Sequence, residues 1–133
     1  MEPRSFDASR ERHAPNRFIG LSLTGAERTI EVTTPTLVAA IKPNCDGCSD
    51  FVHGDLKELD HVDVILVSAT DGGGEWKSAR REILVAPELM NELGIRSAPY
   101  YVLIDPLRSS VITEGALMSP AQVASEIGRY LDA

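Results

Sequence analysis

Two continuous apolar runs in the first half of the chain predict buried central strands. They cover residues 36–41 and 62–67, and neither alternates with polar residues, which is typical of strands covered on both faces. Between them, apolar residues recur at three- and four-residue steps. These residues are Phe51, Val52, Leu56 and Leu59. They predict one amphipathic helix, which Gly54 weakens by about 1 kcal/mol relative to alanine. Strand, helix and strand in this order indicate a right-handed βαβ unit with parallel strands.

The region before these runs divides into a polar and an alternating part. Residues 1–16 are almost all polar and include two prolines, so we expect a flexible tail. Apolar and polar residues then alternate across 18–32, with Gly25 at the turn. This pattern predicts a β-hairpin laid against the domain. The expected organisation is therefore a tail over 1–16 and a single domain over 17–133.

The pattern of apolar and polar residues is irregular between residues 70 and 94. A glycine-rich stretch over 70–74 matches no phosphate-binding loop in its spacing, so we expect a plain connector. Helical spacing then predicts a short helix over 75–81, and 82–85 is expected to form an edge strand. A further helix is expected to begin at Pro87 and to end before Gly94, because proline suits the first helical position and glycine the residue past the end.

The last third predicts a hairpin followed by a helix. Residues 100–104 are β-branched and aromatic, and 111–112 are expected to return as their antiparallel partner. Ser119, Pro120 and Gln122 then form a capping box with proline at the first helical position. One apolar face follows this start. Its members are Val123, Ile127, Tyr130 and Leu131.

Composition and charge narrow the classes of protein. The chain has 133 residues, 43% hydrophobic and 25% charged, as expected of one soluble globular domain. Its net charge of −7 disfavours nucleic acid and anionic lipid as partners. No apolar run reaches the length of about 18 residues that a membrane-spanning helix needs, and residues 1–16 are too polar for a signal peptide. We expect a monomer that is cytoplasmic, or else a soluble fragment of an extracytoplasmic, membrane-anchored protein.

The only two cysteines lie at the point where the first βαβ strand gives way to its helix. Cys45 and Cys48 are three residues apart. Backbone N–H groups and the positive end of the helix dipole at such a turn stabilise a thiolate, which is the reactive form of cysteine. A second thiol one helical turn later can attack a mixed disulfide formed by the first. The pattern therefore predicts a dithiol–disulfide exchange site.

Three other interpretations of the pair stay open. Two cysteines can fall three apart by chance and be inert. A zinc site could use both cysteines with His53 and His61, but structural zinc needs four ligands, and CxxC pairs in such sites usually come with a second pair, which this chain lacks. A purely structural disulfide is disfavoured, because so small a loop constrains little of the unfolded chain.

The order of these features resembles the thioredoxin superfamily. The features are a CxxC pair at the turn of a βαβ unit, the Gly-Ile-x-x-x-Pro segment 94–99 and an antiparallel hairpin. The likeness covers about 17–131, and the hairpin over 18–32 is similar to the redoxin branch, which includes TlpA-like and MauD-like thiol proteins. It implies an α/β thioredoxin-like fold with a central mixed β-sheet flanked by helices and an N-terminal β-hairpin.

The resemblance also assigns roles to residues. It implies that Cys45 is the attacking thiol, Cys48 the resolving thiol, and Pro99 a cis-proline whose loop, with Ala98, pairs with an extended substrate segment. On propensity alone, Pro99 could simply start an edge strand. The implied partners are a disulfide- or dithiol-bearing protein and an electron donor or acceptor, with no cofactor and no metal. The alternative is a redox-inactive thioredoxin-like module that binds a partner at the cis-proline surface.

The chain departs from thioredoxin itself at the site. Asn44 stands where thioredoxin has tryptophan, and Asp46 and Gly47 stand where it has Gly-Pro. Ala39 stands where thioredoxin buries an aspartate that helps to move a proton. A carboxylate one residue away, here Asp46, raises the pKa of a thiol, whereas a helix N-terminus and a nearby ammonium such as Lys42 lower it. The sequence therefore leaves open whether the protein is a reductase or an oxidase.

Overall fold

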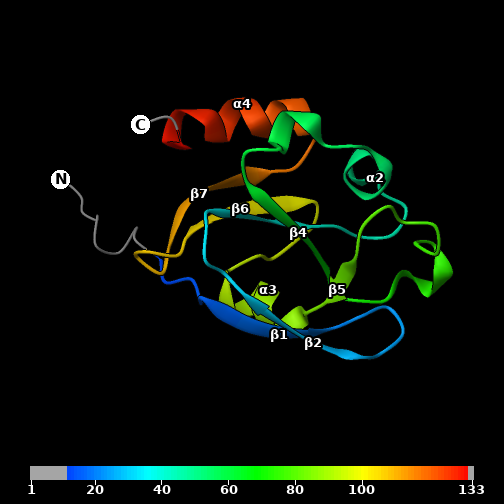
Figure 1. The fold of residues 1–133 in the computed structure, drawn as a ribbon. Helices are drawn as coiled ribbons and strands as arrows, with labels where there is room; N and C mark the ends of the chain where they lie inside the picture. The colour runs from blue at the N-terminus through cyan, green and yellow to red at the C-terminus, as the bar shows by residue number, and fades with distance from the viewer. Residues whose placement is uncertain (1–11, 132–133) are drawn as a thin grey trace.

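A computed structural model describes residues 12–131 of the chain, which fold around one mixed sheet (Figure 1). The strand order across the sheet is β2-β1-β5-β4-β3-β6-β7. The strands are β1 (Arg17–Leu21), β2 (Glu27–Glu31), β3 (Thr36–Ala40), β4 (Asp63–Ser68), β5 (Ile83–Val85), β6 (Tyr100–Asp105) and β7 (Ser110–Ala116). The helices are α2 (Asp46–His53), α3 (Pro87–Glu92) and α4 (Pro120–Leu131), with 3-10 turns η1 (Lys57–Leu59) and η2 (Gly72–Gly74).

The helices cover both faces of the sheet. In Figure 1, α2 and α4 lie on one side of the strands and α3 lies on the other. Two buried apolar clusters correspond to these sides. The first contains residues of α2 and α4, and the second contains residues of α3. This layered arrangement confirms the predicted α/β architecture with a central mixed sheet.

The strand before the cysteines is central, as predicted. All five residues of β3 are buried. The strand runs parallel to β4 and antiparallel to β6, with Ala40 opposite Tyr100. Strand β3 is paired on both edges and covered on both faces. The turn that follows its carboxyl end and leads to the cysteines is therefore attached to a firmly held strand.

The predicted N-terminal hairpin is confirmed, and its position in the sheet shows that β5 is not the edge strand that the sequence predicted. Strands β1 and β2 pair in antiparallel register, with Phe18 opposite Ile30. Strand β1 then joins the sheet by pairing Leu21 with Val85 of β5. The prediction of an edge strand over 82–85 is therefore wrong, because the hairpin takes the edge and leaves β5 between β4 and β1.

Two helix predictions need correction. The helix after the cysteines ends at His53, and Gly54 has an extended conformation, so the predicted apolar face continues as η1 and not as the same helix. The predicted helix over 75–81 is wrong: turns and bends follow η2 across this stretch. Hydrogen bonds to α2 stabilise its irregular backbone, as when the Arg80 N–H bonds to the Val52 carbonyl at 2.9 Å.

Part of the segment that the sequence assigns to the tail contacts the domain. Residues 12–16 already lie along the start of β7, where His13 bridges Ser110 and the Val111 N–H bonds to the Arg12 carbonyl at 2.9 Å. Ala14 is fully buried there. Burial of apolar surface and backbone pairing thus order a polar segment that the composition alone assigned to the tail. Residues 1–11 of the predicted tail, and 132–133, lie outside the described residues.

The C-terminal helix forms as its sequence predicts. The Gln122 N–H donates to Ser119 Oγ at 3.0 Å, and the Ser119 N–H donates to Gln122 Oε1 at 3.2 Å, which is the reciprocal capping box. Val123 and Ile127 are buried against the sheet, whereas Tyr130 is 49% exposed and does not join the buried face. Across residues 12–131, no helix has the length and apolar character needed to cross a membrane.

Candidate dithiol–disulfide site

The two cysteines form a disulfide at the start of α2. Their Cα atoms are 5.3 Å apart. Cys45 is the N-cap residue of the helix, with extended backbone angles, and its side chain makes no capping hydrogen bond. The first N–H groups of a helix have no partner within the helix. The sulfur of Cys45 therefore occupies the position where an anion is stabilised by these groups and by the helix dipole.

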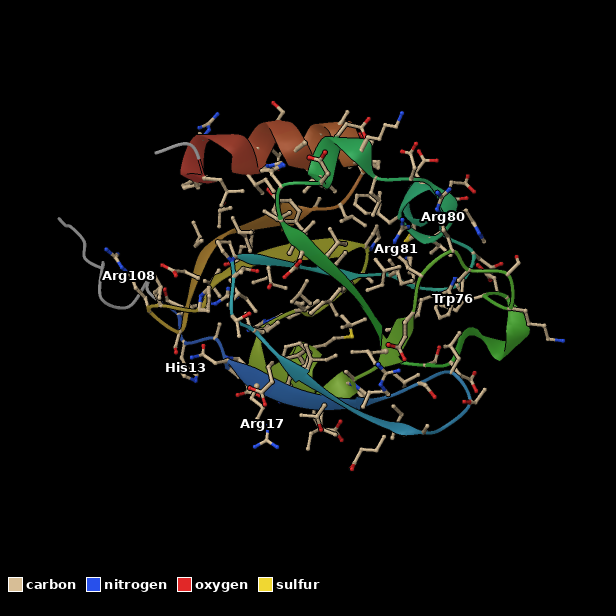
Figure 2. The ribbon with its side chains drawn as sticks, in the orientation of Figure 1. His13, Arg17, Trp76, Arg80, Arg81 and Arg108 are labelled. Carbon is tan, nitrogen blue, oxygen red and sulfur yellow. A yellow bond between two sulfur atoms is a disulfide. The ribbon has the colours of Figure 1, made fainter. Side chains whose placement is uncertain are left out.

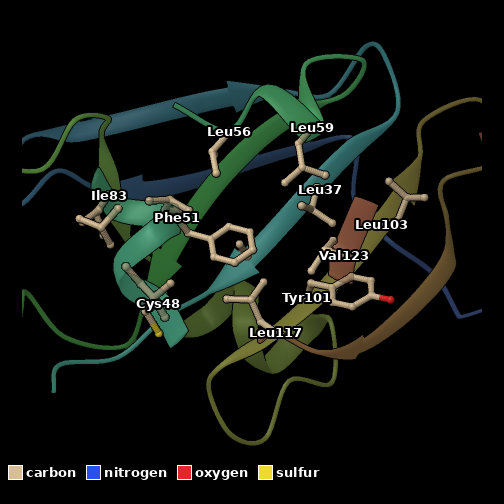
Figure 3. Close-up of a cluster of buried hydrophobic side chains, with 14 of the residues drawn as sticks. Leu37, Cys48, Phe51, Leu56, Leu59, Ile83, Tyr101, Leu103, Leu117 and Val123 are labelled. Atoms are coloured by element: carbon tan, nitrogen blue, oxygen red, sulfur yellow. The ribbon is translucent and has the colours of Figure 1, made fainter. Parts of the chain in front are cut away.

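The two sulfur-bearing residues differ in exposure. Cys48 is 2% exposed and belongs to the same buried cluster as Phe51 and Val52, where Figure 3 shows its side chain beside those of the core. Cys45 is half-buried and packs only against the edge of this cluster. An approaching molecule can therefore reach Cys45 more easily than Cys48.

The structure brings the Pro99 loop to the same edge of the sheet as the cysteines. Strand β3 ends there and the antiparallel β6 begins there, since Ala40 pairs with Tyr100. The bond between Ala98 and Pro99 is cis. The Pro99 carbonyl accepts the Leu117 N–H at 3.4 Å, so the segment after β7 lies beside this loop.

Gly47 allows that segment to approach α2 closely. A Cβ atom at Gly47 would lie 3.3 Å from the Met118 carbonyl oxygen and 3.6 Å from that of Leu117. Glycine thus lets the first turn of α2 pack against 117–118, which is itself bonded to Pro99. Segment 117–118 therefore connects the first turn of α2 to the Pro99 loop through direct contacts.

The buried residue beneath the site is apolar. Ala39 is fully buried and shares the apolar cluster of Cys48. Its partner on β6 is Tyr101, whose hydroxyl donates to Glu126 of α4 at 2.5 Å. Burial, and then this hydrogen bond, raise the pKa of Tyr101 well above its ordinary value. At neutral pH, Tyr101 is therefore a neutral donor and cannot accept a proton in the way that a carboxylate does.

Two residues near α2 were missed by the sequence reasoning. Both carboxylate oxygens of Glu75 accept the Asn44 N–H, at 3.1 and 3.0 Å, one residue before Cys45. At the other end of α2, Arg81 donates to the Phe51 carbonyl and, at 2.7 Å, to that of Gly54. Neither shows a signal in the sequence, because their stretch is irregular and its partners are distant along the chain.

Arg81 completes the C-terminal end of α2. Burial and the charge of Arg80 lower the pKa of Arg81, but its ordinary value is so high that the guanidinium stays charged at neutral pH. It lies beside α2 with Trp76 and Arg80 in Figure 2. A cation bonded to the last carbonyl groups complements the negative end of the helix dipole. The sequence predicted only a connector and a short helix here.

The geometry gives the zinc interpretation no support. Both cysteines are bonded to each other. Residues 12–131 contain no group of three or more His, Cys, Asp and Glu side chains that could hold a metal ion. His53 and His61 are both exposed.

No protein-family model matches the chain, and no curated protein matches it significantly. Solved structures do match. The thioredoxin domain of a thiol-disulfide oxidoreductase from Bacteroides vulgatus is 15% identical, with a TM-score of 0.65, over 92% of this chain and 97% of that one.

Two further solved structures are similar to the same extent. A putative thiol:disulfide interchange protein DsbE from Chlorobium tepidum is 15% identical, with a TM-score of 0.63, over 91% of this chain and 94% of that one. An exposed lipoprotein thioredoxin from Streptococcus pneumoniae is 15% identical, with a TM-score of 0.62, over 85% of this chain and 98% of that one. At these identities the likeness concerns the fold, and the fold of this chain is thioredoxin-like.

Proposed function

We propose that this protein is a thiol–disulfide oxidoreductase that exchanges disulfides through Cys45 and Cys48. The observation that carries the proposal is the asymmetric dithiol: an accessible cysteine at the N-cap of α2 followed by a buried cysteine one turn later. A helix start favours the thiolate of the first residue, and the second is close enough to form a disulfide with it.

The reduced protein would transfer two electrons to a substrate disulfide. The Cys45 thiolate attacks one substrate sulfur, the substrate S–S bond breaks, and the other substrate sulfur leaves as a thiolate that takes up a proton. Cys48 then loses its proton and attacks Cys45 Sγ in the mixed disulfide, which releases the second substrate thiol and leaves the Cys45–Cys48 disulfide. A dithiol-bearing electron donor restores the reduced form, and an oxidase would run the same steps in reverse.

The proton of Cys48 needs an acceptor in this scheme. Ala39 offers none beneath the site, and Tyr101 is itself a protonated donor at neutral pH. We infer that the proton passes to water or to the departing substrate thiolate once the mixed disulfide has opened the site. Resolution of the mixed disulfide is then expected to be sensitive to pH.

The substrate is proposed to be an extended segment of a protein. Ala98 and Pro99 come just before the first pair of the β6–β7 ladder, Tyr100 with Ala116. Their backbone lies at the sheet edge that also carries Cys45. A segment that pairs with this backbone as an added strand would present its disulfide to Cys45 Sγ. The structural similarity to an exposed lipoprotein thioredoxin supports an extracytoplasmic location over a cytoplasmic one.

Turnover of a protein disulfide tests the proposal. Reduction of insulin by dithiothreitol should be accelerated by the wild type, fall to the uncatalysed rate with Cys45→Ser, and give a trapped mixed disulfide through Cys45 with Cys48→Ser. Serine is a favourable N-cap residue, so loss of activity in Cys45→Ser cannot be ascribed to loss of the helix. A wild type that binds protein disulfides without turning them over would instead support the redox-inactive binding module.

A further inference from the structure

The irregular segment 69–82, between β4 and β5, contacts the turn just before α2 and the C-terminal end of α2. On the N-terminal side, the Glu75 carboxylate accepts the Asn44 N–H through both oxygens. On the C-terminal side, Arg81 donates to two backbone carbonyl oxygens. Trp76, between the two, is 3% exposed and packs into the cluster that contains Cys48. One stretch of chain therefore fixes the helix that carries the dithiol.

The residue that Glu75 holds has an uncommon conformation. Asn44 has a φ of 58°, in the left-handed region, which asparagine adopts more readily than most residues. Its N–H belongs to the turn between β3 and Cys45, and a charged acceptor makes a stronger hydrogen bond than a neutral one. The bond to Glu75 therefore fixes the turn that presents Cys45.

The bond to Glu75 also places a negative charge one residue before Cys45. The turn and the start of α2 carry one ammonium, Lys42, and one carboxylate, Asp46. The facing segment adds the Glu75 carboxylate and, two residues later, the Lys77 ammonium; all four residues are exposed. A carboxylate near a thiol disfavours its anion, whereas the helix N-terminus and an ammonium favour it. Of these charges, Glu75 is the one that the fold holds by a hydrogen bond at the residue before Cys45.

We propose that Glu75 is a positioning residue that holds the Cys45 turn and, through its fixed negative charge, keeps the dithiol reducing. The inference rests on the proposed function, because it concerns the same dithiol. A destabilised thiolate makes the reduced form less stable relative to the disulfide. Such a dithiol gives up its electrons more readily, which favours a reductase over an oxidase.

The test is the redox equilibrium of Glu75→Gln with glutathione, measured by the mass shift of alkylated thiols. Glutamine keeps an oxygen acceptor for the Asn44 N–H and removes the charge. The equilibrium constant for reduction should therefore rise about threefold, or about 14 mV at 29.6 mV per tenfold change. The alkylation rate of Cys45 should also reach half its maximum at lower pH. Glu88→Gln is the matched control, because it removes the same charge from the first turn of α3 on the other face of the sheet.

Other outcomes separate the parts of the inference. The equilibrium constant with glutathione could stay at the wild-type value in Glu75→Gln and change only in Glu75→Ala. Glu75 would then only tether the turn, and the proposal would be overturned. If the glutamine variant does not fold, the comparison of Glu75→Asp with Glu75→Ala tests the proposal instead. Aspartate keeps the charge, so the equilibrium constant of Glu75→Asp should lie near that of the wild type. Equal equilibrium constants for Glu75→Asp and Glu75→Ala would overturn the proposal. Because the measurement needs only a reversible disulfide, an enzyme that reduces insulin without this shift refutes the role of Glu75 and leaves the proposed function intact.

Discussion

Helices α4 and α2 pack on the same face of the sheet, yet their N-termini are built differently. Helix α4 spans Pro120–Leu131, and the hydroxyl of Ser119 and the amide of Gln122 satisfy its first backbone groups. Helix α2 is shorter, spans Asp46–His53, and has Cys45 at the N-cap with no side-chain hydrogen bond. The same structural position thus holds a capping hydroxyl in one helix and a sulfur in the other.

This difference at the N-cap distinguishes α4, whose capping stabilises the fold, from α2, which presents a reactive thiol. A serine cap contributes about 0.5–2 kcal/mol to stability relative to alanine. At α2 no N-cap side chain accepts hydrogen bonds from the corresponding donors, and the Cys48 N–H bonds to the Cys45 carbonyl at 3.1 Å. A helix N-terminus favours a thiolate by about 0.3–1 kcal/mol at an exposed position. Helix α2 therefore depends on other parts of the chain for its order, and segment 69–82 supplies these contacts at the turn just before α2 and at its C-terminal end.

The largest effect on the free energy of unfolding is expected at Arg81, where contacts from another part of the chain stabilise α2. Arg81→Met keeps most of the apolar stem and removes the donors to the Phe51 and Gly54 carbonyl groups. It should lower the free energy of unfolding by about 1–3 kcal/mol, the usual cost of leaving partly buried polar groups unpaired. Chemical denaturation measures this change. Arg80→Met is the control, because Arg80 is exposed and bonds to α2 through its backbone, so its substitution should stay within about 0.5 kcal/mol.

A smaller effect should appear at α4, and without any change in redox behaviour. Ser119→Ala removes the hydroxyl that accepts the Gln122 N–H and should lower the free energy of unfolding by about 1 kcal/mol. The glutathione equilibrium of the cysteines should match the wild type. Ser125→Ala, at an exposed position within the same helix, should be neutral or slightly stabilising. If Ser119→Ala altered the redox equilibrium as strongly as a change in segment 69–82, the proposed division between the two helices would be wrong.

The same contrast explains how much could be predicted from sequence. Helix α4 follows from local signals, since Ser119, Pro120 and Gln122 lie within one turn of each other and the buried positions keep helical spacing. The buried strand β3 and the turn with Cys45 also follow from local patterns. These features are sufficient to predict the fold and the position of the dithiol.

The remainder depends on contacts between distant parts of the chain. Glu75 meets Asn44 across 31 residues, and Arg81 meets Phe51 across 30. No periodicity marks such pairs, so the segment that carries them was predicted as a connector and a short helix. The position of β5 was wrong for a similar reason, because pairing with the N-terminal hairpin decides whether it is an edge strand.

Competitive alkylation of the reduced protein tests the central claim most directly. With iodoacetamide below one equivalent at neutral pH, peptide mass spectrometry should find Cys45 modified well before Cys48, because Cys45 lies at the open N-terminus of α2 and Cys48 is 2% exposed. The order should hold in Ser119→Ala. Equal modification of the two thiols, or modification of Cys48 first, would contradict the account of α2 as the helix that presents a reactive thiolate.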